Sequence, residues 1–124
     1  MRLFKTKGFA RFARREKITD ANLREAVSRA ERGLIDADLG GNVIKQRIAR
    51  AGQGRSGGYR VLIAFRAAHR AVLMLGFAKN ERDNISPDEL ESLKRATALW
   101  LTADPAKIDR AIDERVLVEV NYEN

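Results

Sequence analysis

The chain has 124 residues and no cysteine, and 24 lysines and arginines against 17 acids give it a formal net charge of +7. A chain of this length forms one compact domain by default, and the lack of cysteine excludes disulfides, thiol catalysis and cysteine-ligated zinc. The single histidine also excludes a histidine-pair nuclease mechanism and a multi-histidine metal site, whereas the charge favours a polyanionic partner.

The first third of the chain has helical periodicity. Met1 to Phe4 is compatible with a short edge strand, and Lys7 to Lys17 predicts a short helix with its aromatic residues on one face. Thr19 is a good N-cap for a second helix, which Gly33 ends. These segments predict a helical pair that packs its apolar stripe on another surface.

The period then changes from helix to strand. Val43 to Ile48, Tyr59 to Arg66 and Arg70 to Phe77 are rich in β-branched and aromatic residues and are bounded by glycine clusters or short links. The four-residue link that ends at Arg70 is short enough for a hairpin, so we expect an antiparallel meander. The third strand is almost wholly apolar, which predicts a central position.

Two helix starts follow the strands. Ser86 and Glu89 form a capping box around Pro87, and the Asp104 and Pro105 pair begins a shorter helix. Residues 116–120 form either a last strand or a tail that orders on a partner. The expected fold class is α+β: a small antiparallel sheet of three to four strands, with the N-terminal helical pair and the C-terminal helices packed on it. We expect residues 1–124 to form a single domain, with 103–124 as a possible C-terminal extension.

The positive charge is concentrated in the middle of the chain. Between Asn42 and Arg82 there are nine cations and one acid, and the rest of the chain is close to neutral. A three-strand meander brings the end of its first strand, the start of its second and the end of its third to one edge. The cations gathered there are Arg47, Arg50, Arg55, Arg60, Lys79 and Arg82. Guanidinium and ammonium groups in such a cluster suit phosphate esters, although a solvated basic surface is the alternative.

Two other features of this region have simpler interpretations. The loop from Gly52 to Gly58 contains a Gly-x-Gly-x-x-Gly pattern, but a strand follows it, so it does not fit a dinucleotide-binding turn. The glycines either let backbone amides and Arg55 approach a phosphate or make a long hairpin loop. His69 falls in the hairpin link at the opposite end, where a histidine is typically a solvated surface residue.

If the chain cleaves RNA, the simplest metal-free route is attack of a ribose 2′-hydroxyl on the adjacent phosphate, which needs a base, an acid and stabilising cations. Arg47, Arg60 and Arg82 suit charge stabilisation because arginine rarely loses its proton. A lysine among other cations has a lowered pKa, which makes either Lys79 or Lys45 the candidate for proton exchange. Glu81 is either a base or the counter-charge of the cluster, and we favour the counter-charge.

Several segments of the sequence together resemble a known family. They are 43–50 (VIKQRIAR), 52–60 (GQGRSGGYR), 76–85 (GFAKNERDNI), the helix start at Glu89 and Leu90, and the leading segment Phe9 to Leu39. The chain is similar over most of its length, to about Leu101, to RelE/HigB-like toxins of type II bacterial toxin-antitoxin systems.

The resemblance implies a RelE-like fold and an endoribonuclease, or mRNA interferase, that cuts messenger RNA in the ribosome and arrests translation. It implies a cognate antitoxin, frequently with a helix-turn-helix DNA-binding part, and no small-molecule cofactor or metal. By position it assigns catalytic roles to Lys45, Arg47, Arg60, Lys79 and Arg82, and we assign RNA binding to Arg50, Arg55, Gly57 and Gly58. The tyrosine that some of these toxins carry near the C-terminus has only Tyr122 as a counterpart here.

Two other functions stay open at this point. One is a gyrase-inhibiting toxin of the ParE branch, and the other is a nucleic-acid-binding regulatory module without chemistry. No apolar run approaches the roughly 18 residues of a membrane span, and the charged N-terminus lacks the features of a signal peptide, so we expect a cytoplasmic protein with no membrane contact.

Overall fold

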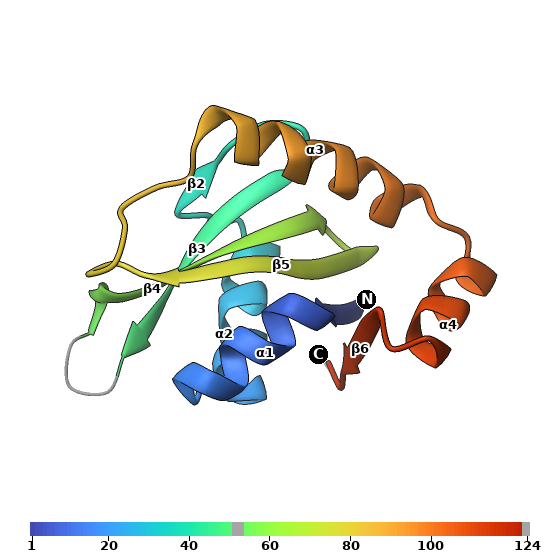
Figure 1. The fold of residues 1–124 in the computed structure, drawn as a ribbon, viewed down its shortest axis with the longest axis horizontal. Coiled ribbons are helices and arrows are strands. Elements are labelled where there is room, and N and C mark those ends of the chain that lie inside the picture. Colours follow the sequence, from blue (N-terminus) through green and yellow to red (C-terminus); the bar gives the residue numbers. More distant parts are fainter. Residues whose placement is uncertain (51–53, 123–124) are drawn as a thin grey trace.

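The fold is described from a computed structural model that covers residues 1–50 and 54–122, with the backbone alone for 54–56 (Figure 1). Helices and strands alternate irregularly along the chain. Their bounds are β1 Arg2–Thr6, α1 Lys7–Glu16, α2 Asp20–Glu31, β2 Ala37–Asp38, β3 Val43–Arg50, β4 Gly54–Arg66, β5 Arg70–Ala78, α3 Pro87–Thr102, α4 Pro105–Asp113 and β6 Leu117–Val120. Within the described ranges, no helix is both long and apolar enough to cross a membrane.

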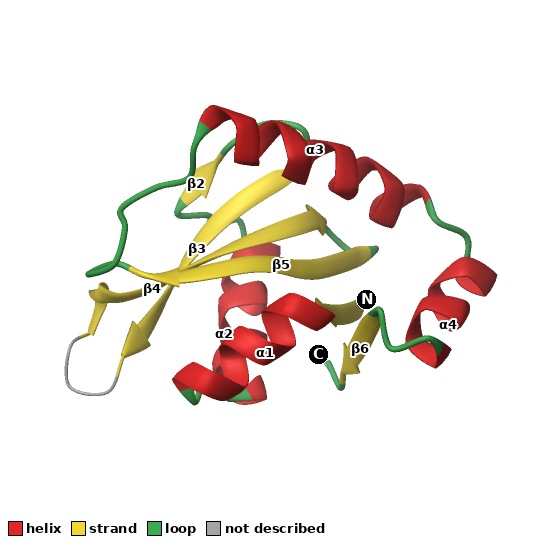
Figure 2. Ribbon diagram, in the orientation of Figure 1, coloured by secondary structure: helices red, strands yellow, loops and turns green. Residues whose placement is uncertain are grey.

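One mixed sheet of six strands forms the centre of the molecule, in the order β2-β3-β4-β5-β1-β6 (Figure 2). The expected antiparallel meander of β3, β4 and β5 is confirmed, as is the central place of β5. The sheet is larger than the expected three to four strands. The first strand is also not at an edge: β1 lies between β5, to which it is parallel, and β6, to which it is antiparallel. The reason is burial, because Leu3 and Phe4 point to opposite faces and both are fully buried.

Side chains cap the helices as the sequence predicts. The Thr19 hydroxyl accepts a hydrogen bond from the Asn22 N–H, and Asn22 returns one to the Thr19 N–H, so α2 starts with a reciprocal capping box. The same arrangement joins Ser86 and Glu89 at the start of α3, next to Pro87. These caps fix where each helix begins, and with it the loops that lead to the sheet.

The helices cover both faces of the sheet. On one face α1 and α2 enclose a core that includes Leu23, Val61 and Leu73, and on the other face α3 and α4 pack over Phe4, Val72 and the neighbouring apolar residues. The α+β class with an N-terminal helical pair is confirmed. The segment expected as an extension is part of this packing, since Ile108 of α4 and Leu117 of β6 are buried beside Phe4.

Candidate functional site

A row of side chains crosses three strands at one end of the sheet. Arg47 of β3 lies opposite Arg60 of β4, and Arg60 lies opposite Phe77 of β5. Side chains alternate between faces along a strand, and Leu62 and Phe77 belong to the core under α3, so this row is on the α3 face. The register of the meander therefore sets two guanidinium groups side by side.

Arg60 is the buried member of this pair, with 7% of its surface exposed. Its guanidinium donates to the Tyr59 carbonyl oxygen at 3.4 Å. Burial lowers the pKa of Arg60, and the positive charge of Arg47 lowers it further, while Asp36 and Asp83 act in the opposite direction. Arg60 is buried and Arg47 is exposed; like charges on neighbouring side chains repel each other, and a bound anion would relieve that repulsion. The pair has the electrostatics of an anion-binding site.

Arg82 reaches the same row from the loop that joins β5 to α3. Its guanidinium carbon lies 5.0 Å from the centre of the Phe77 ring. The same guanidinium donates to the Asn84 carbonyl oxygen at 3.0 Å and to the Glu89 carboxylate at 2.6 Å. The hydrogen bond from Arg82 to Glu89, together with the one from the Ser86 N–H, lowers the pKa of Glu89 to about 2. Arg82 is thus near the arginine pair and also fastens the loop to the start of α3.

The two lysines assigned by sequence flank the row differently. Lys45 is two residues before Arg47 on β3, which places it on the same face, and it lies opposite Leu62. Lys79 follows the last residue of β5; its N–H donates to the Gly58 carbonyl oxygen at 3.0 Å, and it is exposed. The structure therefore brings Lys45, Arg47 and Arg60 together on one face and sets Lys79 at the rim.

A network of hydrogen bonds that includes buried polar side chains fixes the backbone of Arg47. Arg29 of α2, only 5% exposed, donates to both Glu25 carboxylate oxygens, to Asp36 at 3.2 Å and to the Arg47 carbonyl oxygen at 2.5 Å. Asp36 accepts the Arg47 N–H at 2.7 Å. Fully buried Gln46 completes the network, because its side chain accepts the Asp36 N–H and donates to the Ala26 carbonyl oxygen.

Sequence reasoning missed Arg29 and Asp36. The N–H and the carbonyl oxygen of Arg47 lie on the edge of β3 that the two-residue β2 does not cover. There the side chains of Asp36 and Arg29 form the hydrogen bonds that a neighbouring strand would otherwise supply. Burial acts to raise the pKa of Asp36, but the hydrogen bonds from Arg47 and Arg29 outweigh it and lower the pKa. The only signal in the sequence was an arginine within the apolar stripe of α2, four residues after Glu25.

The comparisons with known proteins agree with this arrangement. A family model described as the RelE toxin of the RelE/RelB toxin-antitoxin system matches residues 1–120. The chain belongs to the RelE toxin family. A search of curated proteins finds no match. Membership makes the chain the toxin of a toxin-antitoxin system and implies a cognate RelB-type antitoxin.

Not all predicted site residues of this RelE toxin lie on the α3 face. Arg50 is on the opposite face, where its guanidinium carbon lies 5.6 Å from the centre of the Tyr59 ring, so the grouping of Arg50 with Arg47 and Arg60 is wrong. The side chain of Arg55 lies outside the described residues, as does the loop 51–53 that holds the first part of the glycine pattern. Gly57 is half-buried in β4.

Gly58 has a packing reason to be glycine. The register slips here, since Ile48 lies opposite Tyr59 but Arg50 lies opposite Gly54. A Cβ atom at Gly58 would collide with the Ile48 carbonyl oxygen. Gly58 therefore allows β3 and β4 to approach closely beside the arginine pair.

The opposite end of the sheet holds His69 and Tyr122. His69 is exposed in the turn between β4 and β5, as expected. The Tyr122 hydroxyl donates to Glu31 at 3.0 Å, and Glu31 also accepts the Ala68 N–H of that turn. Burial, with the hydrogen bond to Glu31, raises the pKa of Tyr122 to about 12. The C-terminal tyrosine of this RelE toxin is therefore far from the arginine pair and serves to pin the chain end.

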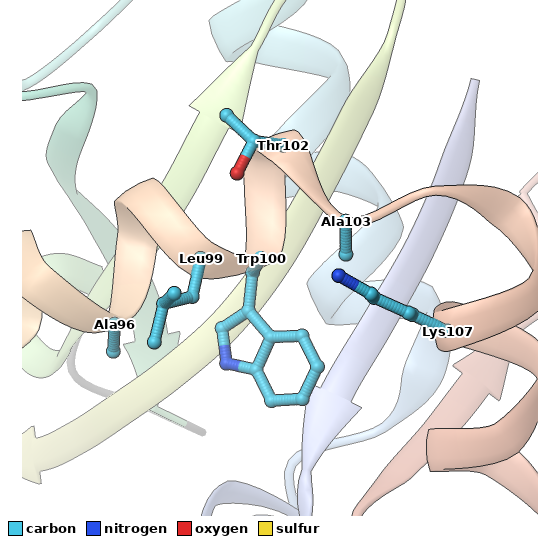
Figure 3. Close-up of a pocket in the computed structure, with 6 residues that line it drawn as sticks. All are labelled: Ala96, Leu99, Trp100, Thr102, Ala103 and Lys107. Carbon is cyan, nitrogen blue, oxygen red and sulfur yellow. The ribbon is translucent and has the colours of Figure 1, made fainter.

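A separate hollow of about 420 Å³ lies where α3 meets α4. Its wall is mostly apolar, with Leu99 and Trp100 projecting from α3 and Lys107 of α4 reaching toward Ala103 (Figure 3). Leu99 is 71% exposed. The hollow contains none of the predicted site residues, so it does not extend the arginine site.

Proposed function

We propose that this RelE toxin is a metal-independent endoribonuclease that cleaves messenger RNA on the ribosome and arrests translation. The observation that carries the proposal is the pair formed by Arg47 and Arg60, two guanidinium groups set opposite each other on one sheet face. Guanidinium groups donate in a planar fork that matches phosphate oxygens, and a phosphate between them would offset their mutual repulsion.

The proposed reaction is an internal transfer of the phosphodiester. The ribose 2′-oxygen bonds to phosphorus and gives its proton to a base, while the bond from phosphorus to the 5′-oxygen breaks and an acid protonates that oxygen. The products are a 2′,3′-cyclic phosphate and a 5′-hydroxyl. Arg47 and Arg60 stabilise the negative charge that develops on the phosphoryl oxygens. Lys45, on the same sheet face, and Lys79, at its rim, are the candidates for proton transfer.

A translating extract tests the proposal. Added wild-type protein is expected to produce cuts in messenger RNA at positions fixed by the reading frame, mapped by primer extension, with 5′-hydroxyl ends downstream of each cut. Arg47→Gln is expected to abolish the cuts, whereas Arg66→Gln, an exposed arginine at the far end of β4, removes the same charge and should leave them intact. Damage to DNA without RNA cuts would indicate gyrase inhibition instead, and neither effect would indicate a binding module.

The proposal also covers the class of antitoxin and the place where the toxin acts. We propose that the cognate antitoxin carries a helix-turn-helix DNA-binding part and that the toxin acts in the cytoplasm, where ribosomes translate. Co-purification with the product of an adjacent reading frame, and loss of messenger RNA cuts when that product is added in equal amount, are the expected results. Cuts that persist with the bound partner present would contradict this part of the proposal.

A further inference from the structure

The exposed side of α1 is strongly basic. Lys7, Arg11, Arg14 and Arg15 are all exposed, while Phe9 and Phe12 on the other side of the helix are buried in the core. Lys17, which caps the C-terminal end, is exposed as well. The charge balance of the sequence hides this surface, because residues 83–124 have ten acids and five lysines and arginines and cancel the excess.

Acidic groups scarcely interrupt this basic side. Glu16 is the one acid of α1, and its carboxylate lies 3.4 Å from the Arg15 guanidinium. On α2, by contrast, Asp20, Glu25 and Glu31 are interleaved with the arginines. The charges of α2 therefore compensate one another locally, and those of α1 do not.

Packing sets the C-terminal half of α1 beneath the arginine end of the sheet. The Phe12 ring contacts the Tyr59 ring edge-on, with 6.0 Å between centroids, and the Tyr59 hydroxyl donates to the Glu16 carbonyl oxygen. Arg50 extends over that same Tyr59 ring. The next residue, Arg60, points to the opposite face. Figure 1 shows α1 running under the sheet toward the β3–β4 end, so cations border this end on both faces.

We propose that the exposed side of α1, together with Arg50, is a second RNA-binding surface, which holds the phosphate backbone of a segment flanking the cleavage site. The inference rests on the proposed function, since it assumes that the arginine pair binds the scissile phosphate. The RNA then passes around the β3–β4 end of the sheet, with the scissile phosphate on the α3 face and the flanking backbone against α1.

The chemistry of the surface favours RNA over other polyanions. A membrane-binding helix inserts its apolar side, but the apolar side of α1 is already buried against the sheet. A protein interface is centred on apolar anchors, and the exposed large apolar side chains of the described residues are Leu34, Leu99, Val116 and Val118, none of them on α1. Lys7, Arg11 and Arg14 instead follow one another at intervals of about 4.5–6 Å along the helix axis, a linear array suited to a phosphate backbone.

Binding measurements over a range of salt concentrations test this surface without requiring cleavage. The probe is a 2′-O-methyl RNA hairpin with a single-stranded 3′ extension, which lacks the attacking hydroxyl. The α1 variant is Lys7→Gln/Arg11→Gln/Arg14→Gln, and the control is Arg95→Gln/Lys107→Gln/Arg110→Gln, three exposed cations of α3 and α4. The α1 variant is expected to bind the hairpin roughly tenfold or more weakly, with the slope of log K against log salt reduced by about 2–3. A 2′-O-methyl trinucleotide, too short to reach α1, should bind all proteins within about twofold.

Three outcomes would overturn the inference. Equal losses in the two triple variants would show an effect of net charge alone, and unchanged hairpin binding by the α1 variant would show that α1 does not contact RNA. Loss of binding to poly-glutamate with hairpin binding retained would assign the surface to an acidic protein. The proposed function fails separately: a wild-type protein that makes no cuts but shows the expected hairpin binding would lose its enzymatic assignment and keep the α1 surface.

Discussion

The two ends of the central sheet use buried arginine in opposite ways. At the end that carries the β4–β5 turn, Arg70 is 5% exposed and donates to the Trp100 and Ala103 carbonyl oxygens at 2.7 and 2.8 Å. These carbonyls belong to the last turn of α3 and to its C-cap, where the helix dipole is negative. At the other end Arg60 is 7% exposed and lies opposite a second arginine, Arg47.

The different surroundings of the two arginines indicate that Arg70 has a structural role. Arg70 meets the negative end of a helix, so the fold itself compensates the charge that it buries. Arg60 lies beside Arg47, which lowers its pKa, while Asp36 and Asp83 act in the opposite direction. Neither burial nor a like-charged neighbour separates the two residues, because Arg70 also lies opposite Arg2 and Arg66; the helix end to which Arg70 donates separates them.

The largest expected effect is the loss of cleavage in Arg60→Met. Removing one preorganised charge-stabilising group typically slows an enzyme by about 10²–10³-fold, and we expect a loss of at least this size in kcat for RNA cleavage. Methionine fills much of the same volume and relieves the repulsion with Arg47, so the free energy of unfolding should stay within about 1.5 kcal/mol of wild type. Single-turnover kinetics and urea unfolding measure the two quantities, and wild-type cleavage by the variant would contradict the assignment.

The matched change at the other end, Arg70→Met, should reverse this pattern. It removes two hydrogen bonds from a charged donor and leaves the carbonyls at the end of α3 without it, so the free energy of unfolding should fall by about 2–4 kcal/mol. Cleavage per folded molecule, measured well below the melting temperature, should match wild type. A variant that loses cleavage while keeping its stability would erase the distinction between the two ends.

Local patterns in the sequence were enough to predict the helices, the meander and the presence of Arg47 and Arg60 at the same end of the sheet. Capping residues such as Thr19 and Ser86 mark helix starts because their side chains satisfy free N–H groups, and a short hairpin fixes which strands pair. The insertion of β1 beside β5 was not predictable in this way, because a parallel pairing between distant segments leaves no local signal.

The errors at the site have equally physical causes. Arg47 and Arg50 are an odd number of residues apart on one strand, so alternation places them on opposite faces; grouping them by their shared strand end ignored this. The hydrogen bonds of Arg29 and Asp36 depend on how α2 packs beside β3, which no single segment encodes. The basic side of α1 was hidden because acids elsewhere in the chain balance it in any count of charge.

A smaller effect is expected from Asp36→Asn, which removes the acid that partly compensates the arginine pair. Asparagine keeps an oxygen for the Arg47 N–H, so the change is mainly one of charge. Affinity for a short single-stranded RNA should rise by roughly twofold to fivefold, because one repulsive charge near the phosphate is gone. Fluorescence anisotropy measures this, and weaker binding would show that Asp36 acts by holding Arg47 in place.

The same variant has a defined pH dependence. The pKa of Asp36 is lower in the folded protein than the value of about 4 in an unfolded chain, so its ionised form stabilises the fold. That contribution is fully present above about pH 4 and is lost as the pH falls through the lowered folded-state pKa. Urea unfolding should therefore find Asp36→Asn less stable than wild type at neutral pH, with a difference that shrinks in acid. A difference that does not change with pH would assign the effect to packing.

The smallest expected effect concerns Arg82, which lies between the two kinds of arginine. It is near the pair, over the Phe77 ring, yet its guanidinium is bound to Glu89 of the α3 capping box. If Arg82 mainly fastens the loop, Arg82→Gln and Glu89→Gln should lower the melting temperature slightly and to a similar extent, and the double variant should add little to either. Both single variants should then cleave RNA at close to the wild-type rate.

If Arg82 instead binds the substrate, Glu89→Gln releases Arg82 and the affinity for RNA rises, while Arg82→Gln lowers that affinity. The direction of these two changes decides whether the charged row at this end of the sheet stops at Arg60 or continues into the loop before α3.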